Sequence, residues 1–276
     1  MDISTDKRMS DVIEEHADLL AVARQALACL DLTSLNDSDS EDDIAHLCRR
    51  ANGRFGPTAA VCVWPRFAAQ ARRALPNEIA VAAVANFPDG HMDVQRAVAD
   101  TRQIVNAGAQ EVDLVLPYRS LIQGKTCVVN AVLDAVREAC PSLLLKVIVE
   151  SGCLSTPELI AQACELSIAA GADFLKTSTG KVPVSATPEA AQIMLQCIAR
   201  HQTATPAATR IVGFKVSGGI RTVRDAVLYM AMQRRWLGAD AASPTRFRIG
   251  ASGLLDDIEA ILAGEGEGRA ATAGSY

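Results

Sequence analysis

The 276-residue sequence contains few lysines, few aromatic residues and no long apolar run. Lysine and arginine together number 27, but only six of them are lysines, and aromatic residues form 4% of the chain. The formal net charge is -5 and no basic block occurs, which argues against a nucleic-acid partner. No apolar stretch reaches the roughly 18 residues of a membrane-spanning helix, and residues 1–7 are polar. We therefore expect neither membrane association nor secretion.

The eight cysteines and four histidines are scattered along the chain. No CxxC pair occurs and no histidine lies nearby at metal-ligand spacing, so neither a metal site nor a catalytic triad is predicted. The cysteines are typical of small apolar residues in a reducing cytoplasm, which is the location we expect. Cys62 lies in the apolar run Ala59–Val63, where packing is the expected role and lining a cavity is the alternative.

Short apolar runs alternate with alanine-rich helical stretches from about residue 30 to residue 265. This alternation predicts a parallel sheet with crossover helices. Hydrophobic residues form 49% of the chain, which is enough for a large core. Eight strand candidates are the number that closes a (β/α)8 TIM barrel, and no linker divides residues 1–276, so we expect a single domain. The candidates are Leu30–Leu32, Ala59–Val63, Ile79–Val84, Glu111–Leu116, Leu143–Val149, Phe174–Lys176, Ile211–Lys215 and Phe247–Gly250.

Several helix starts carry recognisable capping residues. Thr156-Pro157-Glu158 and Thr187-Pro188-Glu189 each supply an N-cap, a first-position proline and an early acid. Ser40 and Thr222 precede two further helices. An additional amphipathic helix is predicted over residues 10–27, before the first strand. The tail 264–276 is rich in glycine and alanine and is predicted to be mobile, either as a simple disordered end or as an arm that delivers its terminal tyrosine to the active site.

Three of the scarce lysines, Lys146, Lys176 and Lys215, interrupt or end apolar strands. A buried ammonium group must pair with an acid or lose its proton, and a neutral amine is a nucleophile for carbonyl groups. Side chains of neighbouring strands meet inside a barrel, so Lys176 and Lys215 can favour loss of one proton between them. Asp31 and Asp113 are their candidate partners, for proton transfer or, as the alternative, for a purely structural ion-pair network.

Glycine-rich loops follow the last three predicted strands. Glycine allows backbone N–H groups to approach an anion, and a helix that begins in the loop adds a favourable dipole. We expect a phosphate site here, although glycines also form ordinary turns between strands and helices. The loops contribute Gly180-Lys181, Gly218-Gly219 and Gly250-Ala251-Ser252-Gly253.

These motifs together resemble the 2-deoxyribose-5-phosphate aldolases, class I aldolases on a (β/α)8 barrel. The resemblance runs from the first predicted strand to the terminal Ser275-Tyr276. Its most specific stretch is Asp173-Phe174-Leu175-Lys176-Thr177-Ser178-Thr179-Gly180-Lys181, joined by Gly213-Phe214-Lys215. Further matching segments are Leu30–Asn36, Ala60–Phe67, Asn86–Gly90, Glu111–Arg119 and Leu144–Glu150.

The resemblance implies a role for each of these residues. Lys176 is the Schiff-base lysine, Lys215 favours its neutral amine and takes part in proton transfer, and Asp113 shuttles protons through a water. A supporting network comprises Asp31, Thr33, Lys146 and the mobile Tyr276. The resemblance implies a phosphate site formed by Gly180, Lys181, Gly218, Gly219, Ser252 and Gly253. The reaction is reversible cleavage of 2-deoxy-D-ribose 5-phosphate to D-glyceraldehyde 3-phosphate and acetaldehyde, without a metal or an organic cofactor. The only partner implied is the phosphorylated sugar, and a homo-oligomer is allowed.

Two positions depart from the pattern of the family. The family often reads Pro-Ala where this chain has Val216-Ser217, so we expect a looser turn after Lys215. It often has a second serine where Gly253 stands, so we expect weaker phosphate binding. Two other functions remain as alternatives: a Schiff-base aldolase or transaldolase-like barrel for another phosphorylated sugar, and a phosphate-binding barrel that isomerises or only binds its ligand.

Overall fold

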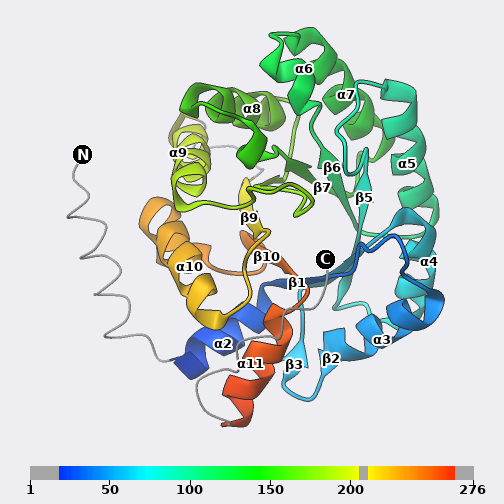
Figure 1. The fold of residues 1–276 in the computed structure, drawn as a ribbon, viewed down its shortest axis with the longest axis vertical. Coiled ribbons are helices and arrows are strands. Elements are labelled where there is room, and N and C mark those ends of the chain that lie inside the picture. Colours follow the sequence, from blue (N-terminus) through cyan, green and yellow to red (C-terminus); the bar gives the residue numbers. More distant parts are fainter. Residues whose placement is uncertain (1–18, 205–210, 265–276) are drawn as a thin grey trace.

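A closed parallel barrel organises the chain in the computed structural model, which describes residues 19–204 and 211–264. The strands follow one another around the barrel in the order β1, β10, β9, β8, β7, β6, β5, β4 (Figure 1). This arrangement confirms the predicted (β/α)8 TIM barrel. The strands are β1 (Leu30–Thr33), β4 (Ala60–Val63), β5 (Ala80–Ala85), β6 (Glu111–Val115), β7 (Leu144–Ile148), β8 (Phe174–Lys176), β9 (Gly213–Ser217) and β10 (Phe247–Ala251).

Helices surround the barrel as an outer ring (Figure 1). They are α2 (Leu19–Ala28), α3 (Glu41–Ala51), α4 (Pro65–Ala74), α5 (Val94–Asn106), α6 (Tyr118–Ile122), α7 (Thr126–Ala139), α8 (Pro157–Ala169), α9 (Pro188–Ala204), α10 (Val223–Leu237) and α11 (Leu254–Ala263). Two 3₁₀ turns, η1 (Ser151–Cys153) and η2 (Ala239–Ala241), lie in loops. A short antiparallel hairpin, β2 (Asn52–Gly53) with β3 (Gly56–Pro57), precedes β4 and was not predicted.

The predicted helix caps are present. Ser40 and Thr222 each form a capping box, at the starts of α3 and α10. The Thr156 side chain accepts the N–H of Leu159 at the start of α8, and the Thr187 side chain accepts the N–H of Ala190 at the start of α9. Because each cap satisfies a backbone donor that the helix leaves unpaired, the boundaries of these helices follow directly from sequence.

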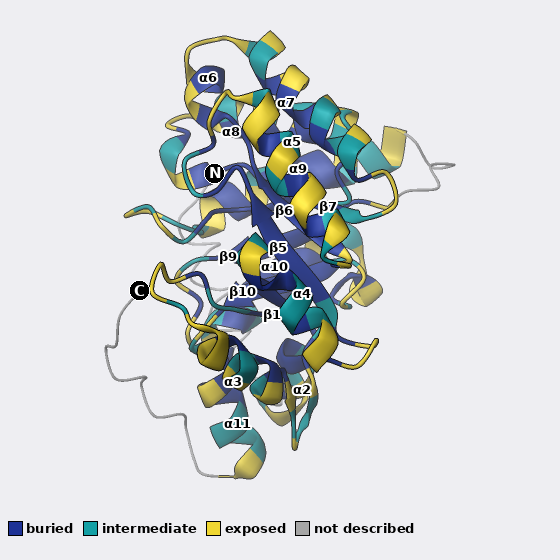
Figure 2. Cartoon of the chain, turned by 90° about the vertical axis from the view of Figure 1, so that its right-hand side faces the viewer, coloured by how far each residue is buried: buried dark blue, intermediate teal, exposed yellow. Residues whose placement is uncertain are grey.

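The strands are buried on both faces, as Figure 2 shows for the centre of the molecule. Along β6, Val112 and Leu114 are fully buried apolar residues, whereas Glu111 and Asp113 alternate with them. Side chains of a strand point alternately to its two faces, so the apolar set packs toward the helices and the charged set points into the barrel. The same strand therefore supplies both core and site.

One predicted strand differs in its boundaries from the structure, and one predicted helix is described only in part. The seventh strand was predicted as Ile211–Lys215, but β9 is Gly213–Ser217, because Ile211 is 55% exposed and Ser217 remains in the ladder with β10. The helix predicted over residues 10–27 is described from Leu19 onward, where α2 packs against α10 and α11. Residues 1–18, 205–210 and 265–276 lie outside the described part of the chain, so the single-domain assignment of 1–276 and the mobile tail stay predictions.

Candidate active site

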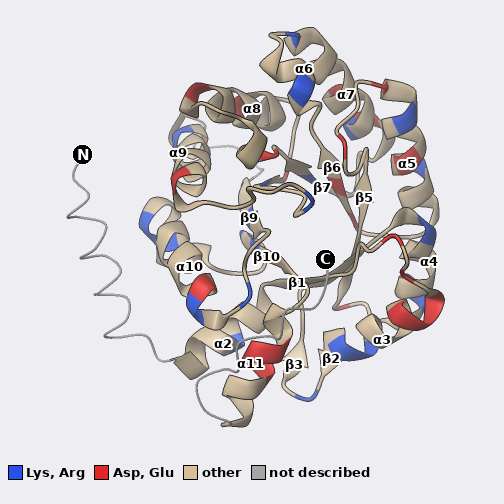
Figure 3. Ribbon diagram, viewed as in Figure 1, with Lys and Arg blue, Asp and Glu red and all other residues tan. Residues whose placement is uncertain are grey.

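The strand register brings the predicted lysines and acids to neighbouring positions. Lys176 on β8 is level with Lys215 on β9, and Lys215 is level with Arg248 on β10. Asp113 on β6 is level with Lys146 on β7. Figure 3 shows that charged residues lie over the outer helices and also on the barrel strands. The second group forms a cluster inside the barrel, here called the interior charge cluster: Asp31, Glu111, Asp113, Lys146, Lys176, Lys215 and Arg248.

Asp113 lies at the centre of this cluster. Its Oδ2 accepts hydrogen bonds from the Nζ atoms of Lys176 and Lys215, each at 2.8 Å. Its Oδ1 accepts one from Lys146 Nζ at 2.8 Å. One fully buried carboxylate therefore contacts three lysines, which gives a proton on any of them a direct route to the others.

The remaining acids complete the cluster. Asp31 Oδ2 accepts from Lys215 Nζ at 2.5 Å, and Asp31 Oδ1 accepts from Arg248 Nη1 at 2.7 Å. Glu111 Oε1 accepts from Arg248 Nη2 at 2.9 Å, and Glu111 Oε2 accepts from Lys146 Nζ. Buried charges are tolerated because each carboxylate oxygen has a cationic donor.

The pKa shifts of Asp113 and Lys215 indicate their charge states. Burial alone would raise the pKa of Asp113, but Lys146, Lys176 and Lys215 hold it well below its usual value. Burial alone would lower the pKa of Lys215, but Asp113 and Asp31 raise it. Both side chains are consequently charged at neutral pH.

The interior charge cluster holds four basic groups and three acids. Within the described residues, Lys176 pairs with Asp113 alone, whereas Lys215 and Lys146 pair with two and three acids. Release of one proton would balance the cluster. Lys176 has the fewest acidic partners among the lysines of the interior charge cluster.

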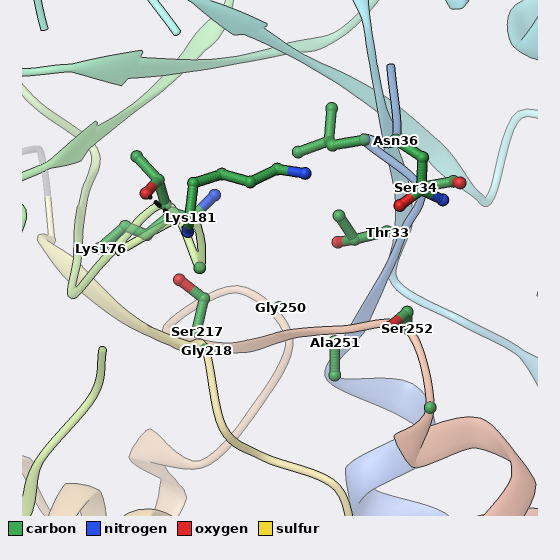
Figure 4. A pocket seen from close by; sticks show the side chains of 14 residues that line it. Thr33, Ser34, Asn36, Lys176, Lys181, Ser217, Gly218, Gly250, Ala251 and Ser252 are labelled. Carbon is green, nitrogen blue, oxygen red and sulfur yellow. Dashed lines mark hydrogen bonds between the residues drawn. The ribbon is translucent and has the colours of Figure 1, made fainter. Parts of the chain in front are cut away.

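A cavity of about 300 Å³ opens above this lysine. Lys176 and Lys181 enter from one side, and Thr33, Ser34 and Asn36 face them from the other (Figure 4). The cavity is lined by Thr33, Ser34, Leu35, Asn36, Lys176, Thr179, Gly180, Lys181, Ser217, Gly218, Gly250, Ala251, Ser252 and Gly253. A molecule bound here would contact the Lys176 amine and the glycine loops together.

Five of the six residues predicted for the phosphate site line this cavity: Gly180, Lys181, Gly218, Ser252 and Gly253. Gly219 is the exception, because it lies one residue beyond the wall. Gly218 has φ +86°, and a Cβ atom there would clash with the side chain of Ser185, so glycine is required for the loop to close against its neighbour. Lys181, Ser252 and three of the predicted glycines therefore line one cavity.

Comparison with known proteins identifies the family. A DeoC/LacD family aldolase model matches residues 25–257. The chain belongs to this aldolase family. A deoxyribose-phosphate aldolase of Agrobacterium fabrum (strain C58) is 48% identical over 253 residues, covering 91% of this chain and 95% of that protein.

Two solved structures support the same fold. The aldolase QR15 is 28% identical with a TM-score of 0.71, covering 87% of this chain and 97% of that one. The deoxyribose phosphate aldolase of Aeropyrum pernix, described as a unique tetrameric structure, is 23% identical with a TM-score of 0.67. That match covers 88% of this chain and 97% of the Aeropyrum chain.

The segment after Lys215 has Val216 and Ser217 where the aldolase family often has Pro-Ala. Val216 and Ser217 continue β9. The Ser217 N–H donates to Thr177 Oγ1 at 2.9 Å, Thr177 Oγ1 and Ser178 Oγ donate to the Ser217 carbonyl at 3.0 and 2.6 Å, and Ser217 Oγ donates to the Ser178 carbonyl. These bonds of Ser217 hold the end of β9 against the loop after β8, and a looser turn than in the family stays a prediction.

Several site residues were missed by reasoning from sequence. Glu111 and Arg248 complete the interior charge cluster, and Ser34 and Asn36 line the cavity. The two-residue spacing of Glu111 and Asp113 could have revealed the first, since both lie on one face of a strand. Arg248 stands in the apolar run Phe247–Ala251, which is the same signal that singled out the lysines.

Thr33, Cys62 and Tyr276 were also singled out from the sequence, and they differ in their relation to the cavity. Thr33 lines the cavity, and its Oγ1 donates to the Asp31 carbonyl at 2.8 Å. Cys62 is fully buried with Sγ 3.8 Å from Asp113 Oδ2, and burial followed by the Asp113 charge raises its pKa to about 11. It is absent from the cavity wall, which fits packing. Tyr276 lies outside the described residues.

Neither a metal site nor a membrane span is found in the part of the chain that the structure describes. No group of three or more histidine, cysteine or acidic side chains there is arranged to hold a metal ion. No helix among residues 19–204 and 211–264 combines the length and apolarity needed to cross a bilayer.

Proposed function

We propose that this aldolase reversibly cleaves 2-deoxy-D-ribose 5-phosphate to D-glyceraldehyde 3-phosphate and acetaldehyde through a Schiff base on Lys176. The observation that carries the proposal is the shared oxygen: Asp113 Oδ2 lies 2.8 Å from both Lys176 Nζ and Lys215 Nζ, beside a cavity lined by Lys181 and glycine loops. The identity of 48% with a deoxyribose-phosphate aldolase supports this choice of substrate.

The first half of the reaction forms the iminium ion. The neutral amine of Lys176 attacks the C1 aldehyde of the open-chain sugar, and protonation of the resulting hydroxyl allows water to leave. Asp113 and Lys215 are the proton carriers for these steps, since they contact each other and Lys176 directly.

The second half breaks the carbon–carbon bond. Loss of the C3 hydroxyl proton lets the C2–C3 bond electrons move onto the iminium, which releases D-glyceraldehyde 3-phosphate and leaves a two-carbon enamine on Lys176. Protonation of the enamine carbon and addition of water then release acetaldehyde and regenerate the amine. The buried cation at Lys215 disfavours a second positive charge on the regenerated amine.

The phosphate group occupies the part of the cavity that the glycine loops line. Gly180, Lys181, Gly218, Ser252 and Gly253 are its proposed contacts, with Gly219 in the adjoining turn. Gly253 lies at the N-terminus of α11, where backbone N–H groups and the helix dipole favour an anion. Weaker phosphate binding than in relatives with a second serine remains a prediction.

The wider setting of the enzyme is also proposed. We assign it to deoxyribose phosphate catabolism and carbohydrate degradation in the cytoplasm, which fits eight free cysteines. A homo-oligomer is proposed because the Aeropyrum pernix relative is tetrameric. The predicted role of Tyr276, which lies outside the described residues, stays a prediction with two alternatives: a simple disordered end or an arm that reaches the site. Deleting it and following proton exchange at the acetaldehyde methyl group tests that role.

Reductive trapping tests the Schiff base. The protein is treated with acetaldehyde and borohydride, and the peptide that contains Lys176 is analysed by mass spectrometry. An added ethyl group on Lys176 is expected, and Lys176→Arg should remove both the label and turnover while the fold stays intact. An unmodified Lys176 in the wild-type protein would refute the lyase and favour the isomerase or binding alternative. Product analysis with 2-deoxy-D-ribose 5-phosphate then separates it from aldolases of other phosphorylated sugars.

A further inference from the structure

Glu150, directly beyond β7, has an unusual backbone for its residue type. Among the described non-glycine residues, only Asn86 and Glu150 have positive φ, at 55° and 56°. Asparagine tolerates this left-handed conformation, and the Asn86 side chain also bonds the backbone of His91 and Val115. Glutamate has no such preference, so its strain must be maintained by the surrounding structure.

The backbone on both sides of Glu150 is fixed to the neighbouring strand. The Val149 N–H donates to the Lys176 carbonyl at 3.0 Å, and the Ser151 N–H donates to the Thr177 carbonyl at 2.9 Å. Between these two bonds, the Glu150 carboxylate accepts the Thr179 N–H, with its two oxygens at 3.2 and 3.4 Å. The residue thus connects the end of β7 with the loop that follows the reactive lysine.

The Glu150 side chain is completely buried, with 0% exposure. Burial raises the pKa of this carboxyl group, although the hydrogen bonds from Thr179 and the charge of Lys176 act in the opposite direction. An acid in such a place is costly unless it has a specific partner. The hydrogen-bond donor to this carboxylate is the Thr179 N–H.

Thr179, which the Glu150 carboxylate holds, in turn contacts Lys181 in the cavity wall. Its Oγ1 accepts the Lys181 N–H at 3.0 Å, and Thr179, Gly180 and Lys181 all line the cavity. The preceding residues Thr177 and Ser178 are held from the other side by Ser217 of β9. The loop after β8 is therefore held between β7 and β9. Ser151 and Glu150 are its contacts on the β7 side.

We propose that Glu150 is a positioning residue that orients the Thr179–Lys181 segment and so fixes the substrate phosphate relative to Lys176. This inference rests on the proposed function. Glu150 is absent from the cavity wall, so it acts through the Thr179 amide and not by touching substrate.

Three variants separate positioning from simple structural support. Glu150→Gln keeps an oxygen acceptor for the Thr179 N–H. Glu150→Asp keeps the charge but is one methylene too short to maintain the contact, and Glu150→Gly removes the carboxylate while relieving the left-handed strain. We expect the Asp and Gly variants to lose about 10- to 100-fold in kcat/KM for 2-deoxy-D-ribose 5-phosphate, mainly through KM. The Gln variant should stay close to wild type.

Two measurements decide the interpretation. Calorimetric affinity for inorganic phosphate should fall in the Asp and Gly variants, while borohydride trapping of acetaldehyde on Lys176 should persist. Unchanged phosphate affinity, or equal loss of phosphate binding and trapping, would overturn the positioning role. If Glu150→Gly does not fold, Glu150→Asp decides by the same criteria. Absence of trapping in the wild-type protein would instead count against the proposed function, and phosphate calorimetry would still test Glu150.

Discussion

Lys176 and Lys215 place their Nζ atoms 2.8 Å from the same oxygen, Asp113 Oδ2. The two residues are also level with each other on adjacent strands β8 and β9. A carboxylate with one negative charge cannot neutralise two ammonium groups at once. Lys215 also pairs with Asp31, whereas among the described residues Lys176 pairs with Asp113 alone.

Removing the second amine should change both rate and pH dependence. In Lys215→Met, Lys176 becomes the only amine on Asp113 Oδ2, so it should retain its proton more firmly. We expect kcat to fall about 10²- to 10⁴-fold, with partial recovery as pH rises. The pH dependence of kcat and of borohydride trapping measures this effect. A variant with reduced activity but the wild-type pH profile would contradict the proposed role of Lys215.

Removing the central acid should destabilise the fold. Asp113→Asn leaves three buried lysines without this carboxylate, and breaking a buried ion pair costs about 3–5 kcal/mol of unfolding free energy. Urea denaturation followed by circular dichroism provides the measurement. Asp134→Asn, at an exposed position on α7, is the matched control and should leave the midpoint unchanged. Equal midpoints for both variants would argue against a stabilising cluster.

Acid should weaken the folded state through the same carboxylates. The neighbouring cations outweigh burial and lower the pKa values of Asp31 and Asp113 from the ordinary value of 3.8. Their stabilisation is therefore complete above that value and is lost as pH falls toward the folded-state pKa. We expect the unfolding free energy to decline below about pH 5. Urea titrations from pH 7 to pH 3 should show this, with a shallower decline in Asp113→Asn.

The phosphate assignment predicts a selective effect at Lys181. Lys181→Met should raise KM for 2-deoxy-D-ribose 5-phosphate by about tenfold or more, because a charge-assisted contact is worth roughly 1.5–3 kcal/mol. The rate of acetaldehyde trapping on Lys176 should change little. Lys125→Met, on an exposed loop before α7, controls for loss of a surface charge. Unchanged KM in Lys181→Met would remove this residue from the phosphate site.

Gly218 and Gly219 form a matched pair for testing the loop after β9. Both have left-handed φ, +86° and +87°, but a Cβ atom at 218 meets the Ser185 side chain whereas one at 219 meets nothing within 4 Å. Backbone strain should cost each alanine variant about 1 kcal/mol of stability. The contact with Ser185 adds to this cost in Gly218→Ala. Only Gly218→Ala should also raise KM for the phosphorylated substrate. Equal kinetics in the two variants would show that the wall position of Gly218 is unimportant.

Much of the fold was readable from local chemistry. Ser40, Thr156, Thr187 and Thr222 were recognised as caps because each satisfies a donor within three residues of itself. The strand carrying Lys215 was placed two residues early. Its true end depends on hydrogen bonds between Ser217 and Thr177, 40 residues apart, which no local pattern records.

The site was predicted through its lysines and only in part through their partners. Lysine is scarce in this chain, so Lys146, Lys176 and Lys215 stood out against their apolar strands. Arg248 did not, because arginine is common on the surface of the same protein. Glu150 was missed for another reason: its significance lies in a left-handed φ and a contact with Thr179, both of which appear only after folding.

The interior charge cluster also has a consequence for how catalytic competence arises. Each of its members comes from a different strand except Glu111 and Asp113. Lys215 and Asp31 are 184 residues apart, and Arg248 and Asp31 are 217 apart. Asp31 reaches both partners only when the first strand pairs with the last and the barrel is sealed. The complete interior charge cluster therefore depends on the same strand pairing that closes the barrel.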